Sequence, residues 1–218
     1  MGLLDFLKKR TATPEVPPEP APPAPGWDAI ESAFAELYPG QKARHWAHNG
    51  VMRMHDLRNP PENPFDGVSI YDGGSFWHYV SFGLSDLYAR ESNDDWSGFG
   101  YEFTFRLAKS GEAEPPLWPI NVMGSLGRAV FTGSAFGPGH SVNMVKPLDG
   151  PGSESAVTAV LLTKDPGLEQ VRETPHGKLA FLLIHGVQGS VRERALAEGA
   201  ENVLTEIRRG NPELATRI

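Results

Sequence analysis

The sequence predicts an α+β fold in which a β-sheet is flanked by helices. Apolar and polar side chains alternate with the period of a strand at residues 99–107, and residues 76–83 are aromatic and β-branched. Apolar residues recur at helical spacing at residues 27–38 and 118–131. With 218 residues, of which 39% are hydrophobic, the chain is long enough to bury a sizeable core.

Residues 1–25 are predicted to precede this domain as a tail, and the domain covers residues 26–218. The start, MGLLDFLKKR, is too short to span a bilayer, and its basic residues follow the apolar run, which reverses the order of an export signal. It is expected to be a frayed terminus. Contact of residues 2–10 with a membrane surface or an apolar groove stays open as the alternative.

The second half of the tail is a proline tract. Residues 13–25 read TPEVPPEPAPPAP, and the charges within it are Glu15 and Glu19. Because proline fixes φ and removes a donor, the tract is predicted to be an extended polyproline II spacer of about 3.1 Å per residue. Its PxxP spacings leave a second interpretation open, in which the tract is a ligand for an aromatic groove.

The first half of the domain is predicted to hold one helix and four strands. The helix at residues 27–38 ends at Pro39-Gly40, and the stretch NPPENP at residues 59–64 is a loop. Strands are predicted around residues 50–56, 67–71, 76–83 and 99–107. A polar loop joins the last two, which can pair antiparallel or lie apart in one sheet.

The two aromatic strands each have two distinct faces. On residues 99–107 the face expected to be buried carries Phe99, Tyr101, Phe103, Phe105 and Leu107. The reverse face is expected to be at least partly exposed and carries Gly100, Glu102, Thr104 and Arg106. Glu102 and Arg106 each need a partner on a neighbouring strand or else face water. On residues 76–83, Phe76, His78, Val80 and Phe82 oppose Trp77, Tyr79 and Ser81.

The second half of the domain is predicted to alternate helix, strands and helix. The helix at residues 118–131 begins with Pro119 in its first turn and can cover one face of the sheet. The glycine-rich FGPGH at residues 136–140 matches no phosphate loop and is expected to be a bend. Strands follow at residues 141–145, 156–163 and 179–187, the last two in the centre of the sheet. A final helical region at residues 190–209 is interrupted near Gly199 and ends at Gly210.

Composition excludes several classes of function. The chain contains no cysteine, so disulfides and thiol chemistry are absent, which fits a cytoplasmic location. The net charge is −7, and the tail has equal numbers of acidic and basic residues, so the whole excess of acid belongs to the domain. A nucleic-acid partner is not expected, because proteins that bind phosphate backbones concentrate Lys and Arg on one face.

Motifs for catalysis or metal binding are scarce. The sequence has no G-x-S-x-G elbow and no H-E-x-x-H, and we expect no catalytic residue, no cofactor and no metal. His45, His48 and His55 are spaced closely enough for a metal site but lack carboxylates at comparable spacing. His78 is predicted to be a structural imidazole bonded to a neighbouring backbone group, and Asp94-Asp95 a solvated pair. A hydrolase assembled from His78, His140 or Glu102 is the less favoured alternative.

Several segments together resemble one protein family. Residues 77–88 (WHYVSFGLSDLY) and 97–107 (SGFGYEFTFRL) are similar to signature segments of the Suppressor of fused domain, and residues 115–131 (PPLWPINVMGSLGRAVF) continue the likeness. So do LLTKDP at residues 161–166 and TPHGKLAFLLIHGV at 174–187. The resemblance implies a non-catalytic α+β module with a mixed, largely antiparallel β-sheet flanked by helices, like the N-terminal domain of that family.

The resemblance also implies a binding site. In the animal member an extended partner segment adds as a strand beside the strand that resembles residues 77–81, and a nearby aspartate contributes. The matching partner-binding residues here are Trp77, Tyr79, Ser81 and Asp86. Strand addition is physically reasonable, because an open sheet edge supplies backbone donors and acceptors. Packing and loop capping are the alternative roles of Tyr79 and Asp86.

Bacterial members that resemble this chain suggest a function as an immunity protein, which binds and neutralises a cognate toxin in the cytoplasm. The other hypothesis is a scaffold or regulatory binding module held away from its docking point by the proline tract. In both hypotheses the partner is a protein, either a toxin domain or an extended peptide segment.

Overall fold

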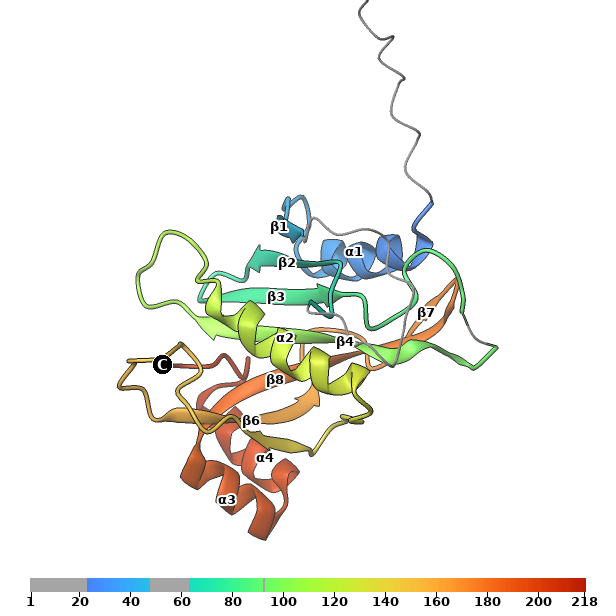
Figure 1. The fold of residues 1–218 in the computed structure, drawn as a ribbon. Coiled ribbons are helices and arrows are strands. Elements are labelled where there is room, and N and C mark those ends of the chain that lie inside the picture. Colours follow the sequence, from blue (N-terminus) through green and yellow to red (C-terminus); the bar gives the residue numbers. More distant parts are fainter. Residues whose placement is uncertain (1–22, 48–62, 92) are drawn as a thin grey trace, which may run out of the picture.

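An eight-stranded sheet organises the part of the chain that this computed structural model describes, which is residues 23–47, 63–91 and 93–218 (Figure 1). The strand order is β1-β2-β3-β4-β8-β6-β5, and β7 pairs with β8 outside that path. β4 and β8 run parallel, whereas the other pairs of neighbouring strands run antiparallel. The sheet is therefore mixed and largely antiparallel, as predicted.

The elements agree closely with those expected from periodicity. The helices are α1 (Pro25–Leu37), α2 (Trp118–Phe131), α3 (Gly189–Glu198) and α4 (Ala200–Gly210). The strands are β1 (Arg44–Ala47), β2 (Gly67–Asp72), β3 (Phe76–Phe82), β4 (Trp96–Ala108), β5 (Ser141–Asn143), β6 (Val157–Lys164), β7 (Arg172–Thr174) and β8 (Gly177–Gln188). Two strands, β1 and β7, were not predicted, because three or four residues carry too little pattern. The strand expected around residues 50–56 lies outside the described residues.

The two aromatic strands pair antiparallel as β3 and β4, which decides between the two arrangements left open by the sequence. Tyr79 lies opposite Phe105, and Val80 lies opposite Thr104. On its other side β3 pairs with β2. β6 and β8 lie in the interior of the sheet, as their continuous apolar runs predicted.

Helices cover both faces of the sheet. In Figure 1, α2 crosses one face over β3, β4 and β8, and its apolar residues share a core with Phe103, Phe105 and Leu182. On the reverse face, α1 packs over β2 and β3 while α3 and α4 pack over β6 and β8. In the described part of the chain, no helix has the length and apolar character needed to cross a membrane.

Because helices cover both faces of the sheet, the expectation of a partly exposed face on β4 was wrong. The reverse face of β4, predicted to be partly exposed, is sealed: Glu102 and Thr104 are fully buried, and Arg106 is 1% exposed. The residue pattern of a single strand cannot distinguish a solvent-exposed polar face from a polar face that is buried under other elements. The polar side chains must therefore find partners inside the protein.

The last residues extend the sheet next to β4. Beyond Phe105, where the pairing with β8 ends, Thr216 forms a parallel bridge with Leu107. The Thr216 amide donates to the Arg106 carbonyl at 2.6 Å, and the Ala108 amide donates to the Thr216 carbonyl at 2.8 Å. β4 thus has a hydrogen-bonding neighbour on this side along most of its length.

Candidate functional site

The four residues that the resemblance pointed to lie on β3 and in the loop after it, and all four are buried. Tyr79 is fully buried and its hydroxyl donates to the Pro116 carbonyl at 2.7 Å. Trp77 lies on the same face and donates from Nε1 to Glu112 at 3.1 Å. Both side chains pack in the α2 core rather than facing an open surface.

β3 offers no free edge in this arrangement, since β2 occupies one side and β4 the other. A partner strand beside residues 77–81 would have to displace one of them. The expectation that Tyr79 meets an incoming segment stays a prediction, and in this conformation α2 and the two neighbouring strands enclose the side chain.

Ser81, near the end of β3, and Asp86, in the loop that follows, lie in a region organised around one buried carboxylate, Glu102. Glu102 Oε1 accepts hydrogen bonds from the amides of Gly83, Leu84 and Ser85 at 2.9 to 3.0 Å and from the Ser85 hydroxyl at 2.7 Å. Glu102 Oε2 accepts from the Ser81 hydroxyl at 2.6 Å. Burial raises the pKa of Glu102 to about 7, although these donors oppose the shift. Glu102 therefore holds the turn between β3 and the following loop in place.

A second buried network lies on the face of the sheet between α1 and the final helices. Asp165 follows β6, and its Oδ2 accepts from His78 Nε2 at 3.0 Å and from the Thr104 hydroxyl at 2.8 Å. Its Oδ1 pairs with Arg106, which also contacts Glu213. Burial alone would raise the pKa of Asp165, but His78 and Arg106 hold it below the usual range. The partners left open for Glu102 and Arg106 are thus both internal.

His78 has a structural position, as predicted, but its partners are side chains rather than backbone groups. Burial lowers the pKa of His78, so the neutral ring donates from Nε2 to Asp165 and accepts at Nδ1 from the Tyr38 hydroxyl at 2.8 Å. The side chain is 0% exposed, which leaves no room for a substrate. His140 lies in the exposed loop before β5 and shares no hydrogen bond with His78 or Glu102 among the described contacts.

The three histidines that were weighed as a metal site, His45, His48 and His55, are only partly described. His45 Nδ1 lies 3.0 Å from the Ser69 hydroxyl, and His48 and His55 fall outside the described residues. Within residues 23–47, 63–91 and 93–218, no group of three His, Cys, Asp or Glu side chains is arranged to hold a metal ion.

The first residues of β4 leave the sheet and open a groove. Trp96 lies opposite Lys178 and Tyr101 opposite Ala180, so residues 97–100 of β4 face a single residue of β8. This bulge turns toward the loop after β3, where the Phe99 amide donates to the Leu84 carbonyl at 2.8 Å. Gly98 has φ +55°, and a Cβ there would lie 2.6 Å from the Leu84 oxygen, so glycine is required.

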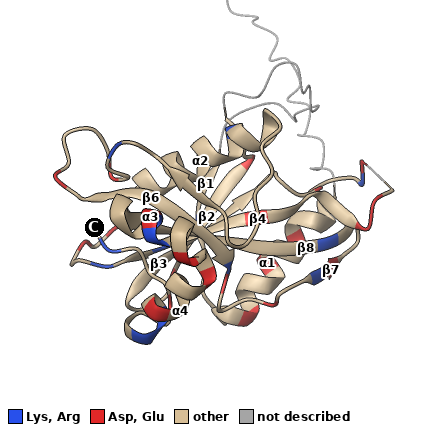
Figure 2. Cartoon of the chain, turned by 90° about the horizontal axis from the view of Figure 1, so that it is seen from below, with Lys and Arg blue, Asp and Glu red and all other residues tan. Residues whose placement is uncertain are grey.

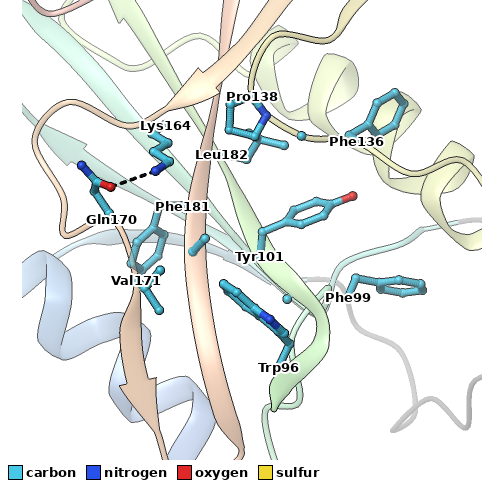
Figure 3. Close-up of a pocket in the computed structure, with 13 residues that line it drawn as sticks. Trp96, Phe99, Tyr101, Phe136, Pro138, Lys164, Gln170, Val171, Phe181 and Leu182 are labelled. Atoms are coloured by element: carbon cyan, nitrogen blue, oxygen red, sulfur yellow. Dashed lines mark hydrogen bonds between the residues drawn. The ribbon is translucent and has the colours of Figure 1, made fainter. Parts of the chain in front are cut away.

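The groove has a volume of about 420 Å³ and an aromatic lining (Figure 3). Trp96, 41% exposed, and the half-buried Tyr101 contribute from β4, and Phe136 and Pro138 from the bend before β5. The opposite side is formed by Gln170, Val171 and residues 180–182. A volume of this size lies within the usual range of about 300–1,000 Å³ for ligand pockets. The FGPGH segment, predicted to be just a bend, thus also lines a surface.

Basic side chains lie around the groove. Lys164 lines it and donates to the Gln170 side-chain oxygen at 2.8 Å, an uncharged partner. Arg172 on β7 directly follows Val171 of the lining, and Lys178 on β8 lies two residues before Ala180 of the lining. Figure 2 shows basic residues on both strands. Arg172 pairs with Glu36, whereas Lys178 approaches Asp95 only to 3.9 Å. The groove can therefore accept an acidic group together with apolar side chains.

The edge of the sheet next to the groove has no further strand in the described part of the chain, and α3 packs near β5. The amide of Leu162 donates to the His140 carbonyl, and the amide of Met144 donates to the Thr158 carbonyl, so alternate residues of β5 bond to β6. The backbone groups of Ser141 and Asn143 consequently point to the other side, where no described strand pairs with β5. β5 begins at Ser141, three residues after Pro138 of the groove lining, so the groove and this edge are neighbours along the chain.

A family model described as Suppressor of fused protein (SUFU) matches residues 61–218. The chain belongs to the Suppressor of fused family. The resemblance noted in the sequence is thereby confirmed, and it extends to the end of the domain.

The Suppressor of fused relatives confirm the fold as well. The mouse Suppressor of fused homolog is 45% identical over 141 residues, which cover 57% of this chain and 28% of the mouse protein. The human homolog is 44% identical over the same length. Less than a third of either relative is therefore matched.

Solved Suppressor of fused structures match a larger part of the chain. The Drosophila protein has a TM-score of 0.76 and 31% identity, covering 89% of this chain and 50% of that one. The crystal structure of the Sufu–Fu complex matches equally well and is covered over 90% of its chain. A putative SUFU homolog from Neisseria gonorrhoeae, with 13% identity and a TM-score of 0.57, shares the fold alone.

Sequence patterns did not indicate the groove. Phe99 and Tyr101 continue the alternation of the core strand, and so they were assigned to the buried face. The available signal was the spacing of Gly98 and Gly100 within an aromatic run, because glycine inside a strand often marks a bulge. The open edge of β5 depends on strand order, which single-strand patterns do not contain.

Proposed function

We propose that this Suppressor of fused domain is a protein-binding module with a non-catalytic role, and that an extended partner segment pairs with the open edge of β5. The observation that carries the proposal is the unpaired edge of β5 beside an aromatic groove. Added strands bond through backbone groups and obtain specificity from pockets for alternate side chains. One member of the family has been solved in a Sufu–Fu complex, which supports a protein partner here.

The β5 edge allows a sharp test, because Ser141 and Val142 direct their backbone groups to opposite sides. Ser141→Pro removes an amide on the open side and should leave the pairing with β6 intact. Ser141→Ala is the matched control, since it removes the hydroxyl and keeps the amide. Purified baits of wild type and both variants are incubated with lysate of the source cell, and bound proteins are quantified by mass spectrometry.

We expect the same proteins on wild type and Ser141→Ala, and at least tenfold less on Ser141→Pro, with melting temperatures of all three within a few degrees. Equal capture by the three baits would show that the partner binds elsewhere. If no protein is enriched on wild type over an unrelated bait, the proposed binding function is wrong.

Trp77, Tyr79, Ser81 and Asp86 stay a prediction from the family resemblance. For them to contact a partner, β2 or α2 would have to move aside, because they are enclosed in the present conformation. Hydrogen exchange of the β2 amides with and without the captured partner tests this. Faster exchange in the complex would favour the β3 site, and unchanged or slower exchange would favour the β5 edge.

The narrower hypothesis of an immunity protein acting in the cytoplasm also stays a prediction. It requires that the captured partner be toxic and that this domain protect cells from it. Co-expression of partner and domain in a heterologous host should restore growth, and Ser141→Pro should fail to do so. A partner without toxicity would favour the scaffold or regulatory module instead.

A further inference from the structure

We propose that residues 14–20 of the chain's own proline tract bind in the aromatic groove, so that the tail is a built-in competitor for that surface. The sequence left two interpretations of the tract open, a spacer or a ligand for an aromatic groove. The groove between the β4 bulge and residues 136–138 now supplies a receptor of the appropriate chemistry. This inference goes beyond the proposed function, because it needs no second protein.

The lining matches what a proline-rich segment requires. Proline segments dock by inserting their rings between aromatic side chains, and they lose little entropy because their extended form is preset. Trp96 and Tyr101 form one wall of the groove, and Phe136 lies at its end (Figure 3). Trp96 is 41% exposed and Val171 is also 41% exposed, so a substantial apolar area on both sides of the groove is left to cover.

Charge complementarity points in the same direction. The charges within the tract are Glu15 and Glu19, each next to a proline on at least one side. Lys164 in the groove has an uncharged side-chain partner, Gln170, in the described contacts. A carboxylate of the tract can therefore pair with Lys164 while the neighbouring prolines contact the aromatic wall.

The place where the tract joins the domain makes the contact geometrically accessible. The Gly26 amide donates to the Leu87 carbonyl at 3.0 Å, and the Asp86 amide in the same loop donates to the Ser97 hydroxyl at 2.9 Å. Ser97 adjoins Trp96 in the groove wall. The tract therefore joins the domain beside the bulge, and because α1 begins at Pro25, the four steps from Pro20 to Ala24 can span about 12 Å at about 3.1 Å each.

Tethering sets the affinity that this contact needs. A short link that can span the distance to the groove gives an effective concentration of about 1 mM or more, so the tail fills the groove more than half the time if the free segment binds with a Kd below about 1 mM. Such weak contacts are sufficient in cis, and they leave the groove available to a stronger ligand in trans.

The test uses the full-length chain and a labelled synthetic peptide of residues 12–25. In one variant, Pro17→Ser, Pro18→Ser, Glu19→Ser and Pro20→Ser together remove the proposed ligand from the chain itself. Peptide binding to this four-serine chain is measured by fluorescence anisotropy and compared with binding to wild type. Trp96→Ala and Lys164→Gln are then added to the four-serine chain, with Leu196→Ala and Lys146→Gln as exposed controls outside the groove.

We expect saturable binding to the four-serine chain with a Kd below about 1 mM, and apparent binding to wild type at least twofold weaker because the groove is already filled. Trp96→Ala should weaken binding about tenfold and Lys164→Gln a few fold, whereas the two controls should have no effect. Absence of saturable binding, equal binding to wild type and the four-serine chain, or insensitivity to Trp96→Ala would each overturn the proposal.

Discussion

The two ends of β4 are both rich in aromatic residues, but one end lies in the core and the other lies at the surface. From Tyr101 to Leu107 each residue of the strand pairs with β8, with β3 or with both, and Phe103 and Phe105 are fully buried between the sheet and α2. Trp96 still pairs with Lys178 of β8, but the next four residues bulge away from it, and the aromatic side chains at this end, Trp96 and Phe99, are 41% and 38% exposed. The difference teaches that regular pairing within the sheet, more than aromatic content, decides whether a strand residue belongs to the core or to a surface.

The largest expected effect comes from replacing one phenylalanine with alanine at each end of β4. Phe103→Ala should lower the free energy of unfolding by about 3 to 5 kcal/mol, because a fully buried ring leaves a cavity. Phe99→Ala should cost about 1 kcal/mol, since its ring is partly exposed and contacts mainly Phe131 at 5.1 Å between centroids. Urea unfolding of both variants measures the difference. Similar losses would mean that the bulge is as tightly packed as the core.

The buried polar network of the inner end should be nearly as sensitive. Asp165→Asn keeps the shape but replaces one acceptor oxygen with a donor, opposite donors from His78, Thr104, Arg106 and the Gly167 amide. We expect a loss of about 3 kcal/mol in unfolding free energy, because a buried cation is left without its carboxylate. Thr104→Ala, which removes one donor and no charge, is the control and should cost about 1 to 2 kcal/mol. Equal effects would show that the Asp165 charge is unimportant.

Because Glu102 is buried where the loop after β3 meets β4, we expect the free energy of unfolding to depend on pH. Its pKa is raised to about 7 in the folded state, so its favourable contribution is complete below the unfolded pKa near 4.5 and is lost as pH rises through 7. When protonated, Oε2 can donate to Ser81 while Oε1 still accepts the three loop amides. Glu102→Gln mimics that form at every pH.

The unfolding free energy of wild type relative to Glu102→Gln should therefore fall by about 1 to 3 kcal/mol between pH 5 and pH 8. Denaturant titrations of both proteins across this range provide the measurement. The buried His185, whose pKa is lowered to about 4, affects both proteins equally and cancels in the difference. A constant difference across the range would mean that Glu102 stays ionised throughout.

The smallest effect on stability is expected at the outer end of β4. Trp96→Ala should change the melting temperature by no more than about 2 °C, because the side chain is largely exposed and packs mainly on Gly100. Calorimetry of the full-length variant checks this. A drop as large as that of Phe103→Ala would show that the groove wall is part of the core.

Much of the fold could be predicted from the sequence, and the reasons are visible in particular residues. α2 begins and ends where its apolar stripe and Pro119 indicated, since one helix face alone decides its position. The burial of Glu102, Thr104 and Arg106 could not be predicted, because their partners lie elsewhere along the chain. The same reason applies to the candidate site, which depends on strand order and on two glycines that interrupt an otherwise regular strand.

The parallel pairing of β4 with β8 also has a consequence for how the protein folds. Arg106 on β4 bonds to Glu213, 107 positions later, and Thr216 completes the hydrogen bonding of β4 beside Leu107. Contacts this distant in sequence require closure of long loops, and proteins rich in them fold in milliseconds to seconds rather than microseconds. During synthesis one side of β4 therefore stays unpaired until β8 and the last residues of the domain have left the ribosome. In this interval the nascent chain is most exposed to aggregation and to chaperones.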